Sequence, residues 1–306
     1  MSHFVAHVFE PGFFHSSPVR SAIIIGAVAA LASGAVGVFT VMRGQSFAGE
    51  ALGDLGTTGG SGAFLVGVGP LWGFLVIGVM AAAMMELIGV QRPRGRDLAT
   101  GIVLGAGLGL AALFLYLDAT HHNTTGAAVT ILFGSVFAIS GSTIPVVVVL
   151  ALSVLGILLT IHRPLLLSSV SAEMAAARGI PVRLVGIGYL LALSLSVSLC
   201  ALTIGAILST ALLVGPAAAA LRVTKRPGAA ILTAGLIGVA VTWLGILLAY
   251  DSYYWPPVGQ GWPVSFFVVS LVFVIYLLSG LPARWVSRRR RLRTGFAATA
   301  GARLEP

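Results

Sequence analysis

The chain has 306 residues, of which 58% are hydrophobic and only 9% charged, and its mean hydropathy is +1.02. Soluble globular domains carry about 25% charged residues, so this composition excludes a soluble globular chain and indicates a protein of the lipid bilayer. A spanning helix takes about 20 apolar residues, which leaves room for roughly eight to ten spans and excludes a large fused domain such as an ATPase. In a membrane protein we interpret the net charge of +9 as a signal of membrane topology rather than of nucleic-acid binding.

Hydropathy windows of about 19 residues predict nine spanning helices, and thus an all-α polytopic membrane protein. In chain order these helices cover residues 21–42, 49–68, 71–90, 98–117, 143–161, 184–202, 204–221, 229–250 and 264–281. The second is the weakest, and the sixth and seventh are almost continuous, so eight spans remain an alternative. The glycines that interrupt the second predicted span are Gly53, Gly56, Gly59, Gly60, Gly62 and Gly67.

Basic residues orient the predicted bundle, because Lys and Arg collect in cytoplasmic loops. If nine spans alternate, one side of the membrane receives Arg43, Arg92, Arg94, Arg96, Arg163, Arg178, Arg183, Arg222, Lys225, Arg226 and the cluster at 284–293, while Arg20 falls opposite. This pattern predicts an N-terminus outside and a C-terminus in the cytoplasm. The predicted organisation is an extracytoplasmic segment at 1–19, a transmembrane domain at 20–282 and a basic cytoplasmic tail at 283–306 that lies near anionic lipid.

The segment 163–182 is the one long stretch on the predicted inner side that does not span. Ser171, Ala172 and Glu173 are typical of a helix start, and Gly179 followed by Pro181 ends the helix. A short cytoplasmic helix in mid-chain offers a contact surface to another protein, and an inert amphipathic loop is the alternative. The sequence has no G-x-x-x-x-G-K-[ST] motif, so ATP energy must come from a separate subunit.

Three acidic residues lie inside predicted spans, where an ionisable group costs about 2.5–3.5 kcal/mol on insertion scales. Glu50 and Asp54 stand at positions i and i+4 of one span, on the same helix face. Two carboxylates so placed repel each other unless a cation or a proton lies between them. The pair therefore predicts a cation pathway, or a position at the cytoplasmic interface where both touch water. Glu86 is interpreted as a snorkelling or paired surface acid rather than a relay group.

Two further groups of residues have side chains that suit a metal, but a solvated role is the prediction for both. They are His3 with His7, and Asp118 with His121 and His122. The single cysteine, Cys200, lies in an apolar run and excludes an internal disulfide. No Ser/His/Asp or Cys/His arrangement supports hydrolytic chemistry, so we do not expect an enzyme.

Four fragments together resemble the membrane permease subunit of ABC transporters that import zinc, manganese or iron. Gly49 to Asp54, reading GEALGD, is similar to the family's G-D-A-L-S-H helix start, and LFGSVFAIS contains a similar F-G-S segment in Phe133, Gly134 and Ser135. SAEMAAARGI resembles the family's coupling helix, and IGAILSTALLVGPAAAALR resembles a signature that includes Gly205 and Pro216. The likeness covers the chain from about residue 13 to residue 280.

The resemblance implies a function for several of these segments. It implies a dimer, of two copies or of two related permeases, with the ion path on the two-fold axis and with Glu50 and Asp54 facing it. It implies an ABC ATPase that contacts the coupling helix through Glu173, Ala177, Gly179 and Ile180, and a metal-binding solute-binding protein outside. It also implies that the divalent metal is the substrate, that no cofactor is bound covalently, and that ATP is hydrolysed in another subunit. The location it implies is a bacterial cytoplasmic membrane, with no nucleic-acid partner.

Two departures from the family pattern refine these expectations. Glu50 and Asp54 stand where the family has Asp and His, and an all-oxygen site favours a harder cation such as manganese over zinc. Val170, Ser171 and Ala172 replace the family's Phe-Asp-Pro before the coupling helix. The rival hypotheses are a stand-alone secondary cation transporter or channel, and a scaffold paralogue that does not transport.

Overall fold

The computed structural model describes residues 16–89, 93–121, 126–134, 136–253, 255 and 261–280. Every regular element in these residues is helical, which confirms the predicted all-α class. The helices are α2 (Ser17–Met42), α3 (Ser46–Leu65), α4 (Pro70–Gly89), α5 (Pro93–His121), α6 (Gly126–Phe133), α7 (Ile144–Val170), α8 (Ala172–Ala177), α9 (Val182–Ile204), α10 (Ser209–Val223), α11 (Pro227–Ser252) and a last helix, Val264–Gly280. Two short 3₁₀ turns, η2 (Val136–Ala138) and η3 (Gly141–Thr143), precede α7.

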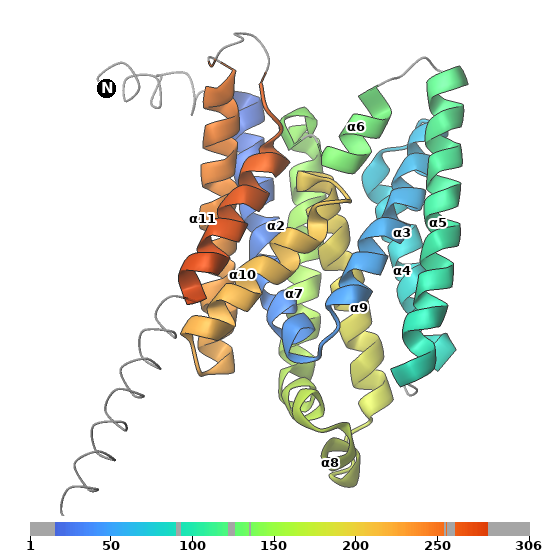
Figure 1. Cartoon of the computed structure of the whole chain (residues 1–306), viewed down its shortest axis with the longest axis vertical. Coiled ribbons are helices and arrows are strands. Elements are labelled where there is room, and N and C mark those ends of the chain that lie inside the picture. The colour runs from blue at the N-terminus through green and yellow to red at the C-terminus, as the bar shows by residue number, and fades with distance from the viewer. Residues whose placement is uncertain are drawn as a thin grey trace, which may run out of the picture.

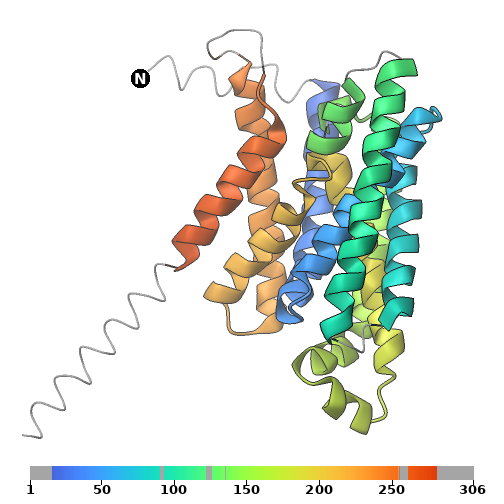
Figure 2. The same ribbon diagram turned by 45° about the vertical axis from the view of Figure 1, so that its right-hand side comes forward.

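The helices form one elongated bundle whose two ends are marked by the short helices α6 and α8 (Figure 1). The helix α2 packs against α11, α10, α7 and α9, and α3 packs against α4, α5 and α9. In both views the last helix lies beside α11 at the edge of the bundle opposite α5 (Figure 2). The turn between α2 and α3 lies at the same end of the bundle as α8 (Figure 1).

Four described helical segments have the length and the apolar composition to cross a membrane. They are Ser17–Met42, Gly141–Val170, Val182–Ile204 and Pro227–Ser252, and four further apolar helices are shorter. These segments contain or overlap the first, fifth, sixth and eighth predicted spans. The number of spans and the orientation of the termini stay predictions.

The fifth and the seventh predicted spans have different bounds in the structure. The predicted span 143–161 continues as α7 to Val170, through Pro164. The predicted span 204–221 begins only at Ser209, because residues 205–208 form a turn between α9 and α10. The 15 residues of α10 extend about 22 Å, less than the roughly 30 Å of a hydrocarbon core. Backbone that is not helical within a bilayer must be buried in protein. Gly205 and Ala206 of this turn are buried, whereas the apolar side chain of Ile207 is 51% exposed.

This turn is held by a crossing of two glycines that are far apart in the sequence. Gly134 has φ +76° and Gly205 has φ +88°. A Cβ atom on Gly134 would lie 2.5 Å from the Gly205 nitrogen, and one on Gly205 would overlap the carbonyl oxygen of Leu132. The Ala206 N–H donates to the Ile131 carbonyl oxygen at 3.1 Å. The crossing thus joins the segment before η2 to the turn that starts α10.

We expect Gly205→Ala to destabilise the fold more than Gly67→Ala does. Gly67 also has a positive φ (+75°), but a Cβ there meets nothing within 4 Å, so only the backbone cost of about 1–2 kcal/mol applies. Gly205 adopts φ 88° and ψ 159°, a region that costs other residues about 1–3 kcal/mol, and the overlap with Leu132 adds to this. Thermal unfolding in detergent measures the difference; equal midpoints for the two variants would contradict the account of the crossing.

Candidate functional site

The helix α3 carries six glycines, and each faces a neighbouring helix. Gly59 meets the backbone of Gly73 in α4, where a Cβ on either glycine would overlap the other's carbonyl oxygen. Small residues allow such close backbone approach in membrane helices. The other contacts are Gly49 with Leu213, Gly53 with Ser209, Gly56 and Gly60 with Phe74, and Gly62 with Phe114. Five of the six glycines that interrupt the second predicted span are therefore packing positions, and the sixth, Gly67, lies beyond the end of α3 in open space.

The carboxylates of Glu50 and Asp54 lie on the face of α3 that the glycine contacts leave open. Glu50 is exposed and Asp54 is half-buried in the single chain. In the described part of the chain, no Lys or Arg forms an ion pair with either carboxylate. Because both are on one face, one turn apart, their charges repel until a cation or a proton lies between them. The face thus has the oxygen donors that a divalent cation binds.

Two hydroxyl side chains continue the same face and were not singled out from the sequence. Thr57 and Ser61 follow Glu50 at i+7 and i+11, which is the spacing of one helix stripe. Both are buried, and their hydroxyls donate to carbonyl oxygens of α3, Thr57 to Gly53 at 3.4 Å and Ser61 to Thr58 at 3.1 Å. Their oxygen lone pairs remain acceptors. The four residues form a polar stripe about 16 Å long.

The turn between α2 and α3 fixes where the polar stripe begins. The Gln45 N–H donates to the Thr40 carbonyl oxygen at 2.9 Å, and the Gly44 N–H donates to that of Val41 at 3.1 Å. These two bonds, with Gly44 at φ +61°, form a Schellman cap that ends α2. α3 then starts at Ser46, one turn before Glu50.

Glu86 is a paired acid, as the sequence predicted. Its Oε1 lies 3.8 Å from Nε of Arg183, at the start of α9. The Arg183 side chain is 65% exposed, whereas the Glu86 side chain is only 12% exposed, so the acid lies at the edge of the core rather than on the open surface. The pair connects the end of α4 to the start of α9, whereas Glu50 lies on α3.

The other candidate metal ligands lie mainly outside the residues that the structure describes. His3, His7 and His122 lie outside the described residues, as does the side chain of His121. Asp118 is buried within α5, with 2% of its surface exposed, rather than at a loop tip. The described residues contain no group of three or more His, Cys, Asp or Glu side chains that could hold a metal ion.

The short helix predicted after Ser171 is present as α8. The Ser171 hydroxyl accepts from the Met174 N–H at 3.2 Å and caps the helix, whose first turn carries Glu173. Gly179, at φ +76°, ends it in a Schellman cap, with the Ile180 N–H donating to the Ala175 carbonyl oxygen. Ala175 is fully buried and Ile180 packs against the main hydrophobic core. The other residues of α8, including Ala177, are exposed and form a small surface at the end of the bundle.

The remaining residues of the family-like fragments lie at positions that serve the fold rather than the polar stripe. Phe133 ends α6, Gly134 and Gly205 form the glycine crossing, and Pro216 is buried inside α10. Ser135 lies outside the described residues. The F-G-S segment and the segment from Ile204 to Arg222, which are far apart in the sequence, thus meet in space at the crossing.

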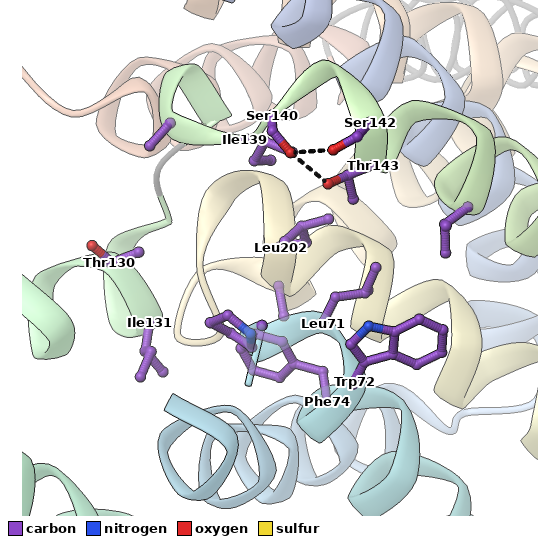
Figure 3. A pocket seen from close by; sticks show the side chains of 15 residues that line it. Leu71, Trp72, Phe74, Thr130, Ile131, Ile139, Ser140, Ser142, Thr143 and Leu202 are labelled. Carbon is purple, nitrogen blue, oxygen red and sulfur yellow. Dashed lines mark hydrogen bonds between the residues drawn. The ribbon is translucent and has the colours of Figure 1, made fainter. Parts of the chain in front are cut away.

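A cavity of about 470 Å³ opens beside the crossing, between α4, α6, η2, α7 and α9. Figure 3 shows Ser140, Ser142 and Thr143 on one side of it, with the Ser140 Oγ 2.8 Å from that of Ser142 and 3.2 Å from Oγ1 of Thr143. None of its 15 lining residues is Asp, Glu, His or Cys. The cavity is lined by hydroxyl and apolar groups, so it lacks charged oxygens such as those that α3 carries. The Phe74 ring lies between the cavity and the glycines of α3.

Comparisons with known proteins agree with this architecture. The chain is 33% identical over 238 residues to the manganese transport system membrane protein MntC of Halalkalibacterium halodurans, covering 76% of this chain and 78% of that protein. It is 25% identical to the high-affinity zinc uptake system membrane protein ZnuB of Haemophilus influenzae, covering 78% and 90%. The structure of PsaBC from Streptococcus pneumoniae in complex with a Fab has the same fold, with a TM-score of 0.75, 24% identity and coverage of 91% and 94%. The sequence model of the ABC 3 transport family matches residues 16–280, so the chain belongs to that family.

Proposed function

We propose that this chain is the transmembrane permease of an ATP-driven importer of divalent metal ions, with manganese favoured and zinc or iron as the alternatives. The observation that carries the proposal is the polar stripe of α3, where Glu50 and Asp54 face away from the packed glycine contacts of the same helix. Family membership supports an ABC transport role, and relatives named for manganese and for zinc transport support a metal ion as substrate.

In the proposed assembly, two permease subunits bring their polar stripes to a shared two-fold axis. Glu50 is exposed in the single chain, which fits a position that a second subunit covers. Two copies of Glu50 and Asp54 supply four carboxylates, enough to hold a divalent cation that has lost part of its hydration shell. Bound in this way, the cation also relieves the repulsion within each pair.

Donor chemistry favours manganese over zinc in this proposal. Carboxylate and hydroxyl oxygens suit harder cations, whereas zinc is commonly bound through the nitrogen of His or the sulfur of Cys. Neither His nor Cys lies on the α3 stripe, which offers Glu50, Asp54, Thr57 and Ser61. A metal-binding protein delivers the ion from outside, and this chain itself forms and breaks no covalent bond.

The proposed energy source is an ABC ATPase that contacts α8. The surface of α8 is small and exposed, and its buried Ala175 and the packing of Ile180 tie it to the core. Closure of two ATPase subunits below the bundle would move α8 against α7 and α9, which flank it in the chain. The proposed cycle takes place in the bacterial cytoplasmic membrane, with α8 on the cytoplasmic side.

We expect Glu50→Gln and Asp54→Asn each to lower ATP-driven uptake of manganese by about ten-fold or more. Each change removes one charged oxygen ligand with little change of shape, and even the outer-shell partners of a bound metal are worth about 10- to 100-fold in affinity. The measurement is uptake of radioactive manganese into vesicles that contain the permease, with and without its ABC ATPase and its metal-binding protein.

Glu86→Gln is the matched control for this experiment, because Glu86 is also a glutamate near a helix end but pairs with Arg183. Folding is measured on the same samples, since relief of repulsion can stabilise the neutral variants. Normal manganese uptake by both neutral variants would refute the α3 pathway. Uptake by the wild type that needs no ATPase would instead support a stand-alone transporter or channel.

We expect Ala177→Arg to weaken binding of the ATPase subunit by about ten-fold or more, which corresponds to about 1.4 kcal/mol. The reason is that a bulky charge on the exposed face of α8 disrupts a packed contact. Ala229→Arg is the matched control: Ala229 is an exposed alanine in the first turn of α11, at the same end of the bundle. Co-purification of the ATPase measures binding. Equal retention of the ATPase by both variants would show that α8 is not the docking element.

A further inference from the structure

Arg43 connects the start of α3 to the two helices on either side of α8. It is the C-cap residue of α2, half-buried, three residues before α3 begins. Its Nη1 donates to the Ser168 Oγ of α7 at 3.1 Å, and its Cζ lies 5.1 Å from the centre of the Tyr189 ring of α9. A single side chain in the α2–α3 turn therefore contacts both neighbours of α8.

The partners of Arg43 are themselves held by further contacts. The Tyr189 hydroxyl donates to Thr40 Oγ1 at 2.9 Å, one helical turn before Arg43 in α2. The Ser168 hydroxyl donates to the Leu165 carbonyl oxygen at 3.1 Å, so it accepts from Arg43 with its geometry already set. Each hydroxyl has a defined partner, which makes the network directional and rigid.

An edge-to-face contact between Phe39 of α2 and His162 of α7, with ring centres 5.9 Å apart, adds to the network on the same face of α2. The Phe39 ring also belongs to the main core with Leu165 and Tyr189, and Ile180 packs against that core immediately after α8. The end of α2 is thus in contact with the segments before and after α8.

The position of Ser168 and Tyr189 relative to α8 decides what a displacement of α8 does. Ser168 lies four residues before Ala172, the first residue of α8, and Tyr189 lies two turns into α9. A shift of α8 that carries the end of α7 or the start of α9 with it must either break the contacts of Arg43 or move the α2–α3 turn. That turn leads directly into the helix that carries Glu50 and Asp54.

We propose that Arg43 is a positioning residue that transmits displacement of α8 to the first turn of α3, an inference that rests on the proposed transport function. A guanidinium suits both roles, because its planar fork donates to Ser168 while its charge lies over the Tyr189 ring. The ammonium of a lysine retains the charge and the hydrogen bond but not the stacking geometry. The two contacts described for Arg43, with Ser168 and Tyr189, lie outside both the polar stripe of α3 and the exposed residues of α8.

The experiment measures manganese ions transported per ATP hydrolysed, in vesicles containing the permease with its ATPase and binding protein. We expect Arg43→Gln to lower this ratio by about five-fold or more, the lower end of typical coupling between two sites, while ATP hydrolysis continues. Arg43→Lys should lower it less, and Ser168→Ala should lower it in the same direction. A residue that only supports folding would reduce transport and hydrolysis together and leave the ratio unchanged.

Arg222→Gln is the matched control, because Arg222 makes the same kind of contact elsewhere. Its Nη1 donates to the Tyr276 carbonyl oxygen at 3.1 Å, its Nη2 donates to the Tyr276 hydroxyl, and its Cζ lies 3.7 Å from that ring's centre, but the pair connects α10 to the last helix. We expect the ratio to stay at the wild-type value.

An unchanged ratio in Arg43→Gln, or an equal fall in Arg222→Gln, overturns the inference and leaves the proposed function standing. A wild type that transports no manganese with ATP refutes the proposed function itself, and the inference with it. If Arg43→Gln does not fold, Arg43→Lys and Ser168→Ala decide in its place.

Discussion

Close contact between helix backbones is the constraint on which this fold depends. In a bilayer, apolar side chains gain little by turning away from lipid, so helices associate through packing and small residues. The chain meets this requirement where α3 crosses α4 at Gly59 and Gly73, and where the turn before α10 crosses the segment after α6 at Gly134 and Gly205. A side chain at either point would separate the backbones, and at the second it would also break the bond from the Ala206 N–H to the Ile131 carbonyl oxygen, where no water can replace it.

The same packing gives α3 its candidate function. Because its glycines meet α4, α5, α9 and α10, one stripe of the helix is left for polar side chains. Glu50 and Asp54 lie where that stripe is open, and Thr57 and Ser61 continue it into the buried part of the bundle. In the proposed cycle α3 is therefore both a packing element and the ion path, and the α2–α3 turn at Arg43 is where movement can reach it.

Much of this could be predicted from the sequence because the relevant signals are local. Hydropathy predicts the long helices, and Ser171 with Gly179 predicts α8, since caps depend on neighbouring residues. The turn at 205–208 could not be predicted, because its stability comes from Gly134, about 70 residues earlier in the sequence. Five glycines of α3, from Gly53 to Gly62, weaken the hydropathy window of the second predicted span, although in the structure they are helix contacts. The sequence could also have predicted that Thr57 and Ser61 belong to the polar stripe, since they follow Glu50 at helical spacing.

The most direct test of the account is the choice between manganese and zinc when both compete for uptake in the same vesicles. Asp54→His places an imidazole nitrogen on the α3 stripe without changing the packing glycines. We expect the wild type to prefer manganese, and Asp54→His to shift the uptake ratio towards zinc, because nitrogen is the softer donor. A ratio that is the same for the two proteins would contradict the claim that the metal passes along Glu50 and Asp54.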